Sequence, residues 1–237
     1  ILDPFCGSGT TLLESYLNGY QAIGTDMNPL AVKIASAKTA ILDINPDLIT
    51  EVVNNLLSML QSKKKIHRKQ LNQFSEETHE ELSRWFPHPV LIKLNWLLTE
   101  IRNSSAGALQ NYLEVILSSI IREVSQQEPT DLRIRYKKEP IKDADVFGLF
   151  ENALINQYNK LEKFWAIRGY APNRFFSATA IEADNRDWRS FKRAGVKKNS
   201  IDLVLTSPPY AMALPYIDTD RLSLLAIMGL SSSDRRP

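Results

Sequence analysis

The stretch that decides the fold opens the sequence: Ile1-Leu2-Asp3-Pro4-Phe5-Cys6-Gly7-Ser8-Gly9-Thr10. Its first two residues are typical of the end of a buried strand. The residues that follow, 11–18, have the apolar spacing of an amphipathic helix. Glycine suits the loop between them, because it lets the backbone turn tightly and approach a ligand closely. Since the helix also offers free N–H groups at this point, the stretch predicts a ligand-binding loop between a strand and a helix.

The glycine spacing of this loop argues against a dinucleotide and against a phosphate group as the ligand. A dinucleotide fingerprint needs a third glycine where Leu12 stands, and a phosphate loop needs a lysine that this stretch lacks. Asp3 places a carboxylate at the start of the loop, which favours a ligand with a cationic end. The alternative interpretation is an ordinary turn between strand and helix.

A second strand is predicted over residues 21–25, and it ends at Asp26. An acidic residue at this place accepts hydrogen bonds from both ribose hydroxyls of a nucleoside; the alternative is a capping aspartate. Asn28 and Pro29 are typical of the cap and first residue of a further helix. The alternation of strand and helix predicts a parallel sheet.

A different loop, Thr206-Ser207-Pro208-Pro209-Tyr210, follows the apolar strand predicted over residues 200–205. The two prolines hold the backbone extended. The carbonyl oxygens and the Ser207 hydroxyl are acceptors beside the flat ring of Tyr210, an arrangement that suits an exocyclic amino group on a planar base. The alternatives are a proline-rich peptide ligand and a tight turn with a packed tyrosine.

Between these motifs the chain changes character, and residues 45–170 show long helical periods with almost no glycine. A crossover between two strands does not need a segment of this length, so the sequence predicts an inserted helical region. Two basic runs in it, 63–69 and 133–138, are candidates for phosphate contacts, or else solvated faces. The helices are expected at 46–62, 75–86, 88–103, 107–126 and 144–167.

Composition excludes several classes of protein. The net charge of +2 excludes a uniformly basic coat, so a polyanion must meet a local patch. The single cysteine, Cys6, excludes an internal disulfide and a cysteine-based zinc cluster, and no metal site is expected. No apolar run is long enough for a membrane span, and a cytoplasmic location is expected. Because Ile1 already lies inside a motif, we interpret the chain as a piece of a longer protein.

The two loops carry a resemblance to a known family. Residues 3–10 and 206–210 resemble motifs I and IV of the amino-methyltransferases, which transfer a methyl group from S-adenosylmethionine to an exocyclic amine of a DNA base. The serine form of the second motif resembles the N4-cytosine subgroup, whereas its aspartate and asparagine forms are more typical of N6-adenine enzymes. Asp26 matches the ribose-binding acid of motif II. Asp184 matches motif III, although Asp187 competes for that place.

The resemblance implies a fold and a division of the chain. It implies an α/β, Rossmann-like methyltransferase parallel sheet, incomplete in this chain, with a large helical insertion. Residues 1–44 and 171–237 would form the partial methyltransferase domain, and 45–170 the insertion, a candidate nucleic-acid-contacting subdomain. The remainder of the chain or a partner is expected to complete the sheet.

The resemblance also assigns roles to residues. S-adenosylmethionine is the implied cofactor, and the implied catalytic residues are Ser207, Pro208, Pro209 and Tyr210. The residues implied to bind the cofactor are Asp3, Phe5, Gly7, Ser8, Gly9, Thr10, Asp26 and Asp184.

The function that follows is a site-specific DNA methyltransferase of a restriction-modification system, with DNA as its partner and cytosine N4 as the favoured target. Adenine N6 and an RNA base stay open as alternatives. A binding module without catalysis is the remaining class, and the intact Ser207–Tyr210 motif argues against it.

Overall fold

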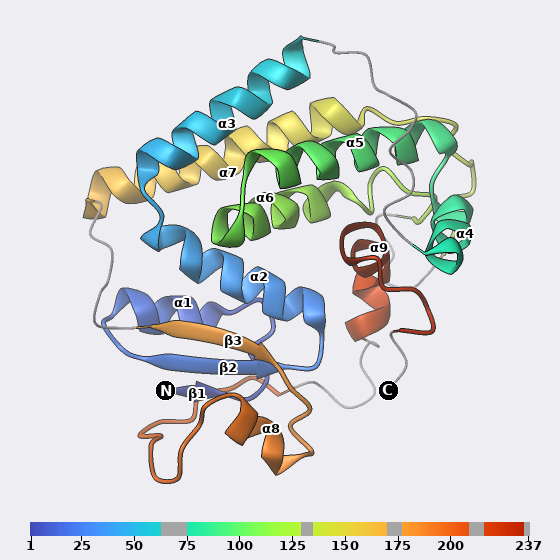
Figure 1. Ribbon diagram of the computed structural model, residues 1–237. Helices are drawn as coiled ribbons and strands as arrows, with labels where there is room; N and C mark the ends of the chain where they lie inside the picture. Colours follow the sequence, from blue (N-terminus) through green and yellow to red (C-terminus); the bar gives the residue numbers. More distant parts are fainter. Residues whose placement is uncertain (63–74, 129–134, 170–176, 209–215, 235–237) are drawn as a thin grey trace. The chain divides into compact units, whose positions relative to one another are not determined.

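The computed structural model describes residues 1–62, 75–128, 135–169, 177–208 and 216–234 (Figure 1). It divides into two compact units. The first comprises Ile1–Asn45, Gly107–Tyr112 and Tyr170–Ala213, and the second comprises Pro46–Ala106, Leu113–Gly169 and Leu214–Pro237. Within the described residues, no helix has the length and apolar character needed to cross a membrane.

A parallel sheet forms the centre of the first unit. Its strands β1 (Leu2–Asp3), β2 (Ala22–Asp26) and β3 (Ala178–Glu182) lie in the order β1-β2-β3. Leu2 is in register with Ile23, and Asp26 with Glu182. Because all three strands run in the same direction, their carboxyl ends lie at one edge. The α/β class and the parallel sheet predicted from the sequence are confirmed.

The segment that precedes Thr206 extends this sheet beyond β1. Leu2 donates a backbone hydrogen bond to Leu203 at 2.9 Å and accepts one from Leu205 at 3.0 Å, and Val204 forms a parallel bridge with Leu2. The predicted strand over 200–205 is therefore present only as a single bridge, because β1 offers it a two-residue partner. Leu203, Val204 and Leu205 are all about half exposed.

Helices cover both faces of the sheet. The helices α1 (Thr10–Leu17) and α2 (Pro29–Ala40) lie on one face and α8 (Trp188–Arg193) on the other (Figure 1). Small side chains of β2 and β3 allow α1 and α2 to approach closely. Burial of this apolar surface stabilises the unit by about 25 cal/mol for each Å² removed from water. The buried cluster consists of Cys6, Leu12, Ala22 and Ala35, with Ile1, Ala178 and Ala180 packed against it.

Local signals account for the ends of these helices. Gly19 has a positive φ of 79° after α1, as expected for a residue that ends a helix. The Asn28 side chain accepts a hydrogen bond from the Leu30 N–H at 3.0 Å, so Asn28 caps α2. A short 3-10 helix, Ile41–Asp43, follows α2.

The second unit is helical in its described part. Its apolar side chains pack between long helices, and Trp85 stacks on Tyr136 with 4.2 Å between ring centroids. The predicted helix over 107–126 ends earlier than expected, at Ile120. Beyond it, the backbone N–H of Gln126 donates to the Trp85 carbonyl. The helices are α3 (Pro46–Gln61), α4 (Glu76–Trp85), α5 (His88–Ser104), α6 (Gly107–Ile120, which begins in the first unit), α7 (Val146–Arg168) and α9 (Tyr216–Met228).

Candidate active site at the carboxyl edge of the sheet

The motifs predicted from the sequence lie together at the carboxyl edge of the sheet. The glycine loop follows β1, Asp26 ends β2, and the turn containing Asp184 follows β3. Ser207 stands two residues beyond Leu205, which is the last residue paired with β1. Because all four segments run parallel, motifs far apart in the sequence meet at one edge, where open α/β sheets bind their ligands.

Asp3 is buried at the start of the glycine loop, with 4% of its surface exposed. Its Oδ1 accepts a hydrogen bond from the Phe5 N–H at 3.1 Å. This contact fixes the turn over Pro4 and leaves the second carboxylate oxygen of Asp3 for another donor. Phe5, in the same loop, is 38% exposed, although phenylalanine side chains are usually buried.

The two glycines of the loop serve different purposes. Gly9 has a φ of +80°, and a Cβ there would lie 2.6 Å from the Cβ of Ala35, so glycine is required for α1 and α2 to pack. Gly7 has a φ of +49°, and a Cβ there would meet no atom within 4 Å among the described residues. Among the described residues, the side of Gly7 where a Cβ would lie therefore faces open space.

Asp26 joins this loop to the end of β2. Its Oδ2 accepts from the Gly7 N–H and its Oδ1 from the Asn28 N–H, each at 2.9 Å. A carboxylate has about four lone-pair sites, so both oxygens keep capacity for a further donor. Asp26 thus orients the glycine loop and still offers acceptors at the sheet edge.

Ser8 and Thr10 are exposed, and no side chain of the described residues caps α1. The Lys38 Nζ donates to the Ser8 carbonyl at 2.9 Å. Burial lowers the pKa of the Lys38 ammonium. This tether from α2 was not predicted from the sequence, because a lysine in a helix carries no signal for such a contact.

The turn after β3 is tied to the glycine loop by Asn185. Its Oδ1 accepts from the buried Thr25 hydroxyl at 2.8 Å, and its Nδ2 donates to the Pro4 carbonyl. Asn185 was not predicted from the sequence as a site residue. The signal was absent because the bond joins residues 181 positions apart.

Asp184, the residue matched to motif III, has a local partner. Its Oδ2 lies 2.8 Å from the Arg186 Nη2, and this hydrogen bond lowers the pKa of the Asp184 carboxyl. Asp187, its competitor, caps α8 by accepting from the Arg189 N–H at 3.0 Å. The capping role occupies Asp187, while Asp184 stays at the sheet edge.

Ser207 and Pro208 are both exposed beyond the last paired residue. Pro209 and Tyr210 lie outside the described residues, as do the basic run 63–69 and the first part of the run 133–138.

Cys6 is buried under the glycine loop. Burial, followed by the charges of Asp26 and Asp3, raises the pKa of its thiol to about 12. A thiol held protonated in this way is no nucleophile. The described residues contain no group of acidic, cysteine and histidine side chains that could hold a metal ion.

The site fits S-adenosylmethionine by the chemistry of its donors and acceptors. The open space beside Gly7 allows close approach of a ligand to the backbone. The spare acceptors of Asp26 suit ribose hydroxyls, and the carboxylate of Asp3 suits an ammonium group. These residues would hold the nucleoside and amino-acid ends of such a cofactor.

Comparison with known proteins supports the same class. Residues 1–37 match the model of the N6/N4 DNA methylase family. The chain is 24% identical to type II methyltransferase M.MvaI of Kocuria varians over 222 residues. This match covers 89% of this chain and 46% of that protein. The chain is 26% identical over 264 residues to M.BsoBI of Geobacillus stearothermophilus, covering 100% of this chain and 48% of that protein. No solved structure shows significant similarity.

These matches confirm the resemblance to the amino-methyltransferases of the N4/N6 family. A further similar protein is type II methyltransferase M.MjaII of Methanocaldococcus jannaschii, at 22% identity over 91% of this chain and 54% of that protein. The chain therefore spans about half the length of the curated relatives it matches.

Proposed function

We propose that the protein is an S-adenosylmethionine-dependent DNA methyltransferase that modifies an exocyclic amino group. The observation that carries this proposal is the meeting of the glycine loop, Asp26 and Ser207 at one edge of a parallel sheet. The similarity to three type II methyltransferases supports DNA as the substrate. The residues proposed to bind the cofactor are Asp3, Phe5, Gly7, Ser8, Gly9, Thr10, Asp26 and Asp184.

The proposed chemistry needs little from the protein beyond positioning. S-adenosylmethionine, when bound, supplies an activated methyl group on a sulfonium sulfur. The protein must hold the target amine in line with that group, and a base inside a duplex must first be flipped out. The hydroxyl of Ser207 and the carbonyl of Pro208 would accept the two amine hydrogens, which favours a pyramidal and more nucleophilic nitrogen. Tyr210 would stack on the base.

We favour cytosine N4 over adenine N6 as the target atom. Position 207 carries a serine hydroxyl, which accepts from an amine and can also donate to a neighbouring ring nitrogen. The serine form of the motif resembles the N4-cytosine subgroup. Adenine N6 is the second candidate, because it also is an amine beside a ring nitrogen.

The chain divides, in this proposal, into a methyltransferase domain of residues 1–44 and 171–237 and a helical insertion of residues 45–170. A cytoplasmic location and a place in a restriction-modification system stay predictions.

Among the described residues, no segment pairs with the side of Val204 that faces away from β1, and this supports a further part of the proposal. Leu2 in β1 is bonded to the carbonyl of Leu203 and to the N–H of Leu205. The N–H and C=O of Val204, which lies between them, therefore point away from β1. An exposed strand edge invites pairing. We therefore expect another part of the protein to pair with Val204. Slow hydrogen exchange at the Val204 amide in the whole protein would support this pairing, and rapid exchange would contradict it.

The experiment that tests the function is methyl transfer by the whole protein. The protein is incubated with S-adenosylmethionine labelled in its methyl group, together with duplex DNA and RNA of the same sequence. We expect label in an amino group of the DNA. Label in RNA with untouched DNA would favour an RNA base methyltransferase, and binding of the cofactor without any transfer would favour the non-catalytic class.

A further inference from the structure

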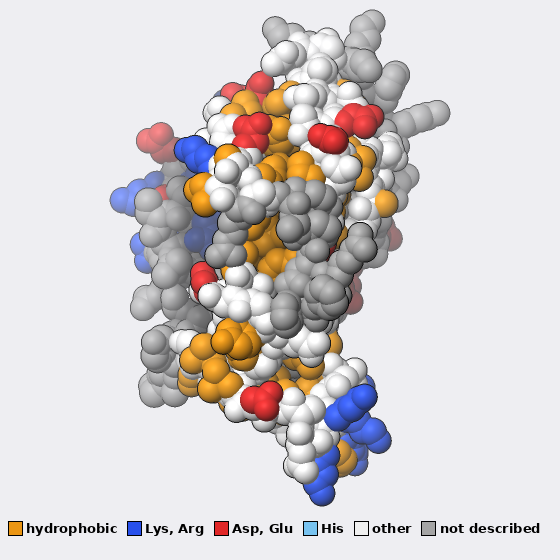
Figure 2. Space-filling view, turned by 90° about the vertical axis from the view of Figure 1, so that its left-hand side faces the viewer, with side chains coloured by type: hydrophobic (Ala, Val, Ile, Leu, Met, Phe, Trp, Pro, Cys, Tyr) orange, Lys and Arg blue, Asp and Glu red, His pale blue; other side chains and the backbone are white. Residues whose placement is uncertain are grey.

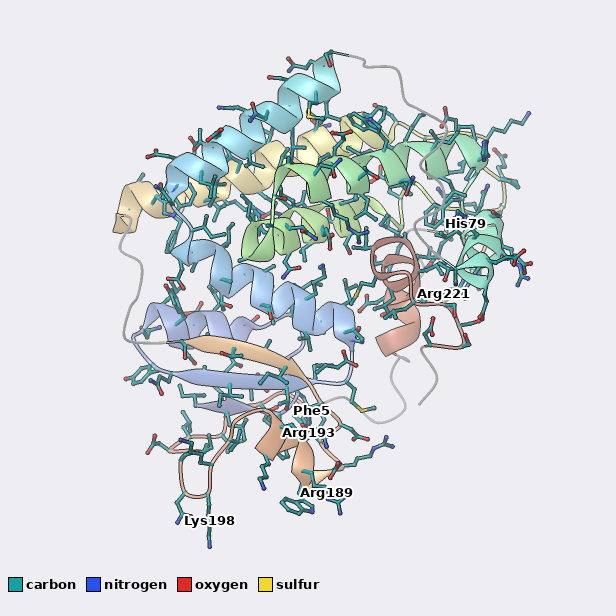
Figure 3. All side chains as sticks on the ribbon, viewed as in Figure 1. Phe5, His79, Arg189, Arg193, Lys198 and Arg221 are labelled. Atoms are coloured by element: carbon teal, nitrogen blue, oxygen red, sulfur yellow. The ribbon has the colours of Figure 1, made fainter. Side chains whose placement is uncertain are left out.

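A cationic surface lies on α8 and the turn after it, outside the glycine loop and the Ser207–Tyr210 motif. We call it the α8 basic surface. Figure 3 shows Arg189, Arg193 and Lys198 on the face of the sheet opposite to α1 and α2, and Figure 2 shows blue side chains gathered at the lower end of the view. Its members are Arg186, Arg189, Lys192, Arg193, Lys197 and Lys198.

The charge of this surface is not balanced locally. Two of its cations have partners: Arg186 pairs with Asp184 at 2.8 Å, and Arg193 approaches Asp187 at 3.4 Å. Within the part of the chain that the structure describes, no ion pair involves the four other cations. These are the exposed side chains of Arg189, Lys192, Lys197 and Lys198. Since the whole chain carries a net charge of only +2, this excess is a local feature.

The surface begins at the candidate site and leads away from it. Arg189 stands one turn after Asp184 and Asn185, which lie at the carboxyl edge of the sheet. Lys197 and Lys198 lie in the turn that brings the chain back to the amino ends of the strands, because the next extended segment again runs parallel to β1. The cations thus follow the α8 face of the sheet from one edge to the other.

An aromatic side chain accompanies the cations. Trp188, the first residue of α8, is 70% exposed, whereas Trp85 and Trp96 in the second unit are buried. Exposure of so large an apolar group is costly unless a partner covers it, and tryptophan and arginine are enriched at the centres of interfaces. Trp188 adds a flat surface that suits a sugar or a base edge next to phosphates.

We propose that the α8 basic surface binds the phosphate backbone of duplex DNA beside the base that enters the candidate site. This inference rests on the proposed function, which supplies the DNA. Phosphate contacts fix the register and orientation of a duplex without reading its sequence. A base can turn out toward Ser207 only if the flanking backbone is held, and the surface reaches the sheet edge where that backbone must pass.

The test compares two sets of neutralised cations in the whole protein. One variant carries R189Q, K192Q, K197Q and K198Q. Its matched control carries R84Q, K142Q, K160Q and K163Q, which neutralise four exposed cations of the second unit. The affinity for duplex DNA of random sequence is measured by fluorescence anisotropy over a range of salt concentrations. The affinity for S-adenosylmethionine is measured separately.

We expect the slope of log affinity against log salt to fall in magnitude by about 2 or more in the first variant, because each phosphate contact contributes about 0.9. The control should keep the wild-type slope, and both should bind the cofactor as the wild type does. Equal slopes in the two variants would overturn the proposal. Quenching of tryptophan fluorescence by DNA should be lost in Trp188→Phe, and its full retention would contradict a contact at Trp188.

The outcome is separable from that of the proposed function. If the slope falls in the variant but the wild type transfers no methyl group, the DNA surface stands and the proposed function fails. If the wild type methylates DNA and the variant keeps the wild-type slope, the surface fails and the function stands. Tighter binding to duplex RNA than to DNA, lost in the variant, would overturn the choice of DNA.

Discussion

The Asp26 carboxylate accepts a hydrogen bond from the backbone N–H of Gly7 at 2.9 Å. This bond joins the end of β2 to the loop after β1. A side chain assigned to cofactor binding therefore also sets the conformation of the loop that would contact the cofactor. The other oxygen of Asp26 holds the Asn28 N–H at the start of α2, so one carboxylate orients two elements at the sheet edge.

Replacement of this carboxylate should weaken cofactor binding. In Asp26→Asn, the side-chain amide nitrogen faces one of the two backbone donors, and a charge-assisted acceptor is lost. We expect a loss of about 1.5–3 kcal/mol in the binding free energy of S-adenosylmethionine, measured by calorimetry on the whole protein. The control is Glu51→Gln, which changes the same charge at an exposed position of α3. Unchanged affinity in Asp26→Asn would contradict the assignment.

The two glycines of the loop should differ in their tolerance of a methyl group. Gly7→Ala places a side chain in open space and costs only the strain of a left-handed residue, about 1–2 kcal/mol. Gly9→Ala carries the same strain and also forces the Ala35 backbone away, which adds about 1–3 kcal/mol. Urea unfolding of both variants measures the difference. Equal loss of stability in the two variants would refute the close packing at Gly9.

The buried thiol of Cys6 should make the protein less stable in alkali. Burial and the nearby carboxylates raise its pKa from 9.0 to about 12. A raised folded-state pKa contributes stability that is fully present below the unfolded pKa. That contribution is lost as the pH rises from about 9 toward about 12. The unfolding free energy of Cys6→Ala should therefore fall less between about pH 8 and about pH 11 than that of the wild type. Parallel profiles would contradict the prediction.

Loss of the Ser207 hydroxyl should affect turnover rather than cofactor binding. Ser207 is exposed at the sheet edge, and its hydroxyl is one of two proposed acceptors for the target amine. A hydrogen bond contributes about 1 kcal/mol net, so Ser207→Ala should reduce kcat about fivefold at unchanged cofactor affinity. Ser232→Ala, at another exposed serine, is the control. A wild-type kcat in Ser207→Ala would assign the acceptor role to the Pro208 carbonyl alone.

Local sequence signals predicted most of the fold. Apolar periodicity and capping residues such as Asn28 place the helices close to their observed ends, and the alternation of strand and helix gave the parallel sheet. Long-range contacts account for the differences. After α6 ends at Ile120, the Gln126 N–H bonds to the Trp85 carbonyl where the sequence predicts helix, and the short β1 limits its neighbour to one bridge.

The candidate site shows the same division. Four site residues could be selected from the sequence. Two of them, Asp3 and Asp26, stand at the ends of predicted strands, and the other two, Gly7 and Gly9, lie in the loop between a predicted strand and a predicted helix. Asn185 could not, since its value lies in bonds to Thr25 and Pro4 that exist only in the folded chain. The α8 basic surface was not selected either, because the sequence shows six cations within residues 186–198 but not that four of them stay exposed without an ion-pair partner among the described residues.

The most direct test of the central claim is mass spectrometry of nucleosides from DNA methylated by the whole protein. The DNA is digested after reaction with S-adenosylmethionine, and DNA incubated with the Asp26→Asn variant is the control. The proposed site predicts N4-methylcytosine, strongly reduced in the variant. N6-methyladenine as the only product would contradict the cytosine assignment, and the absence of any methylated amino group would contradict the proposed function itself.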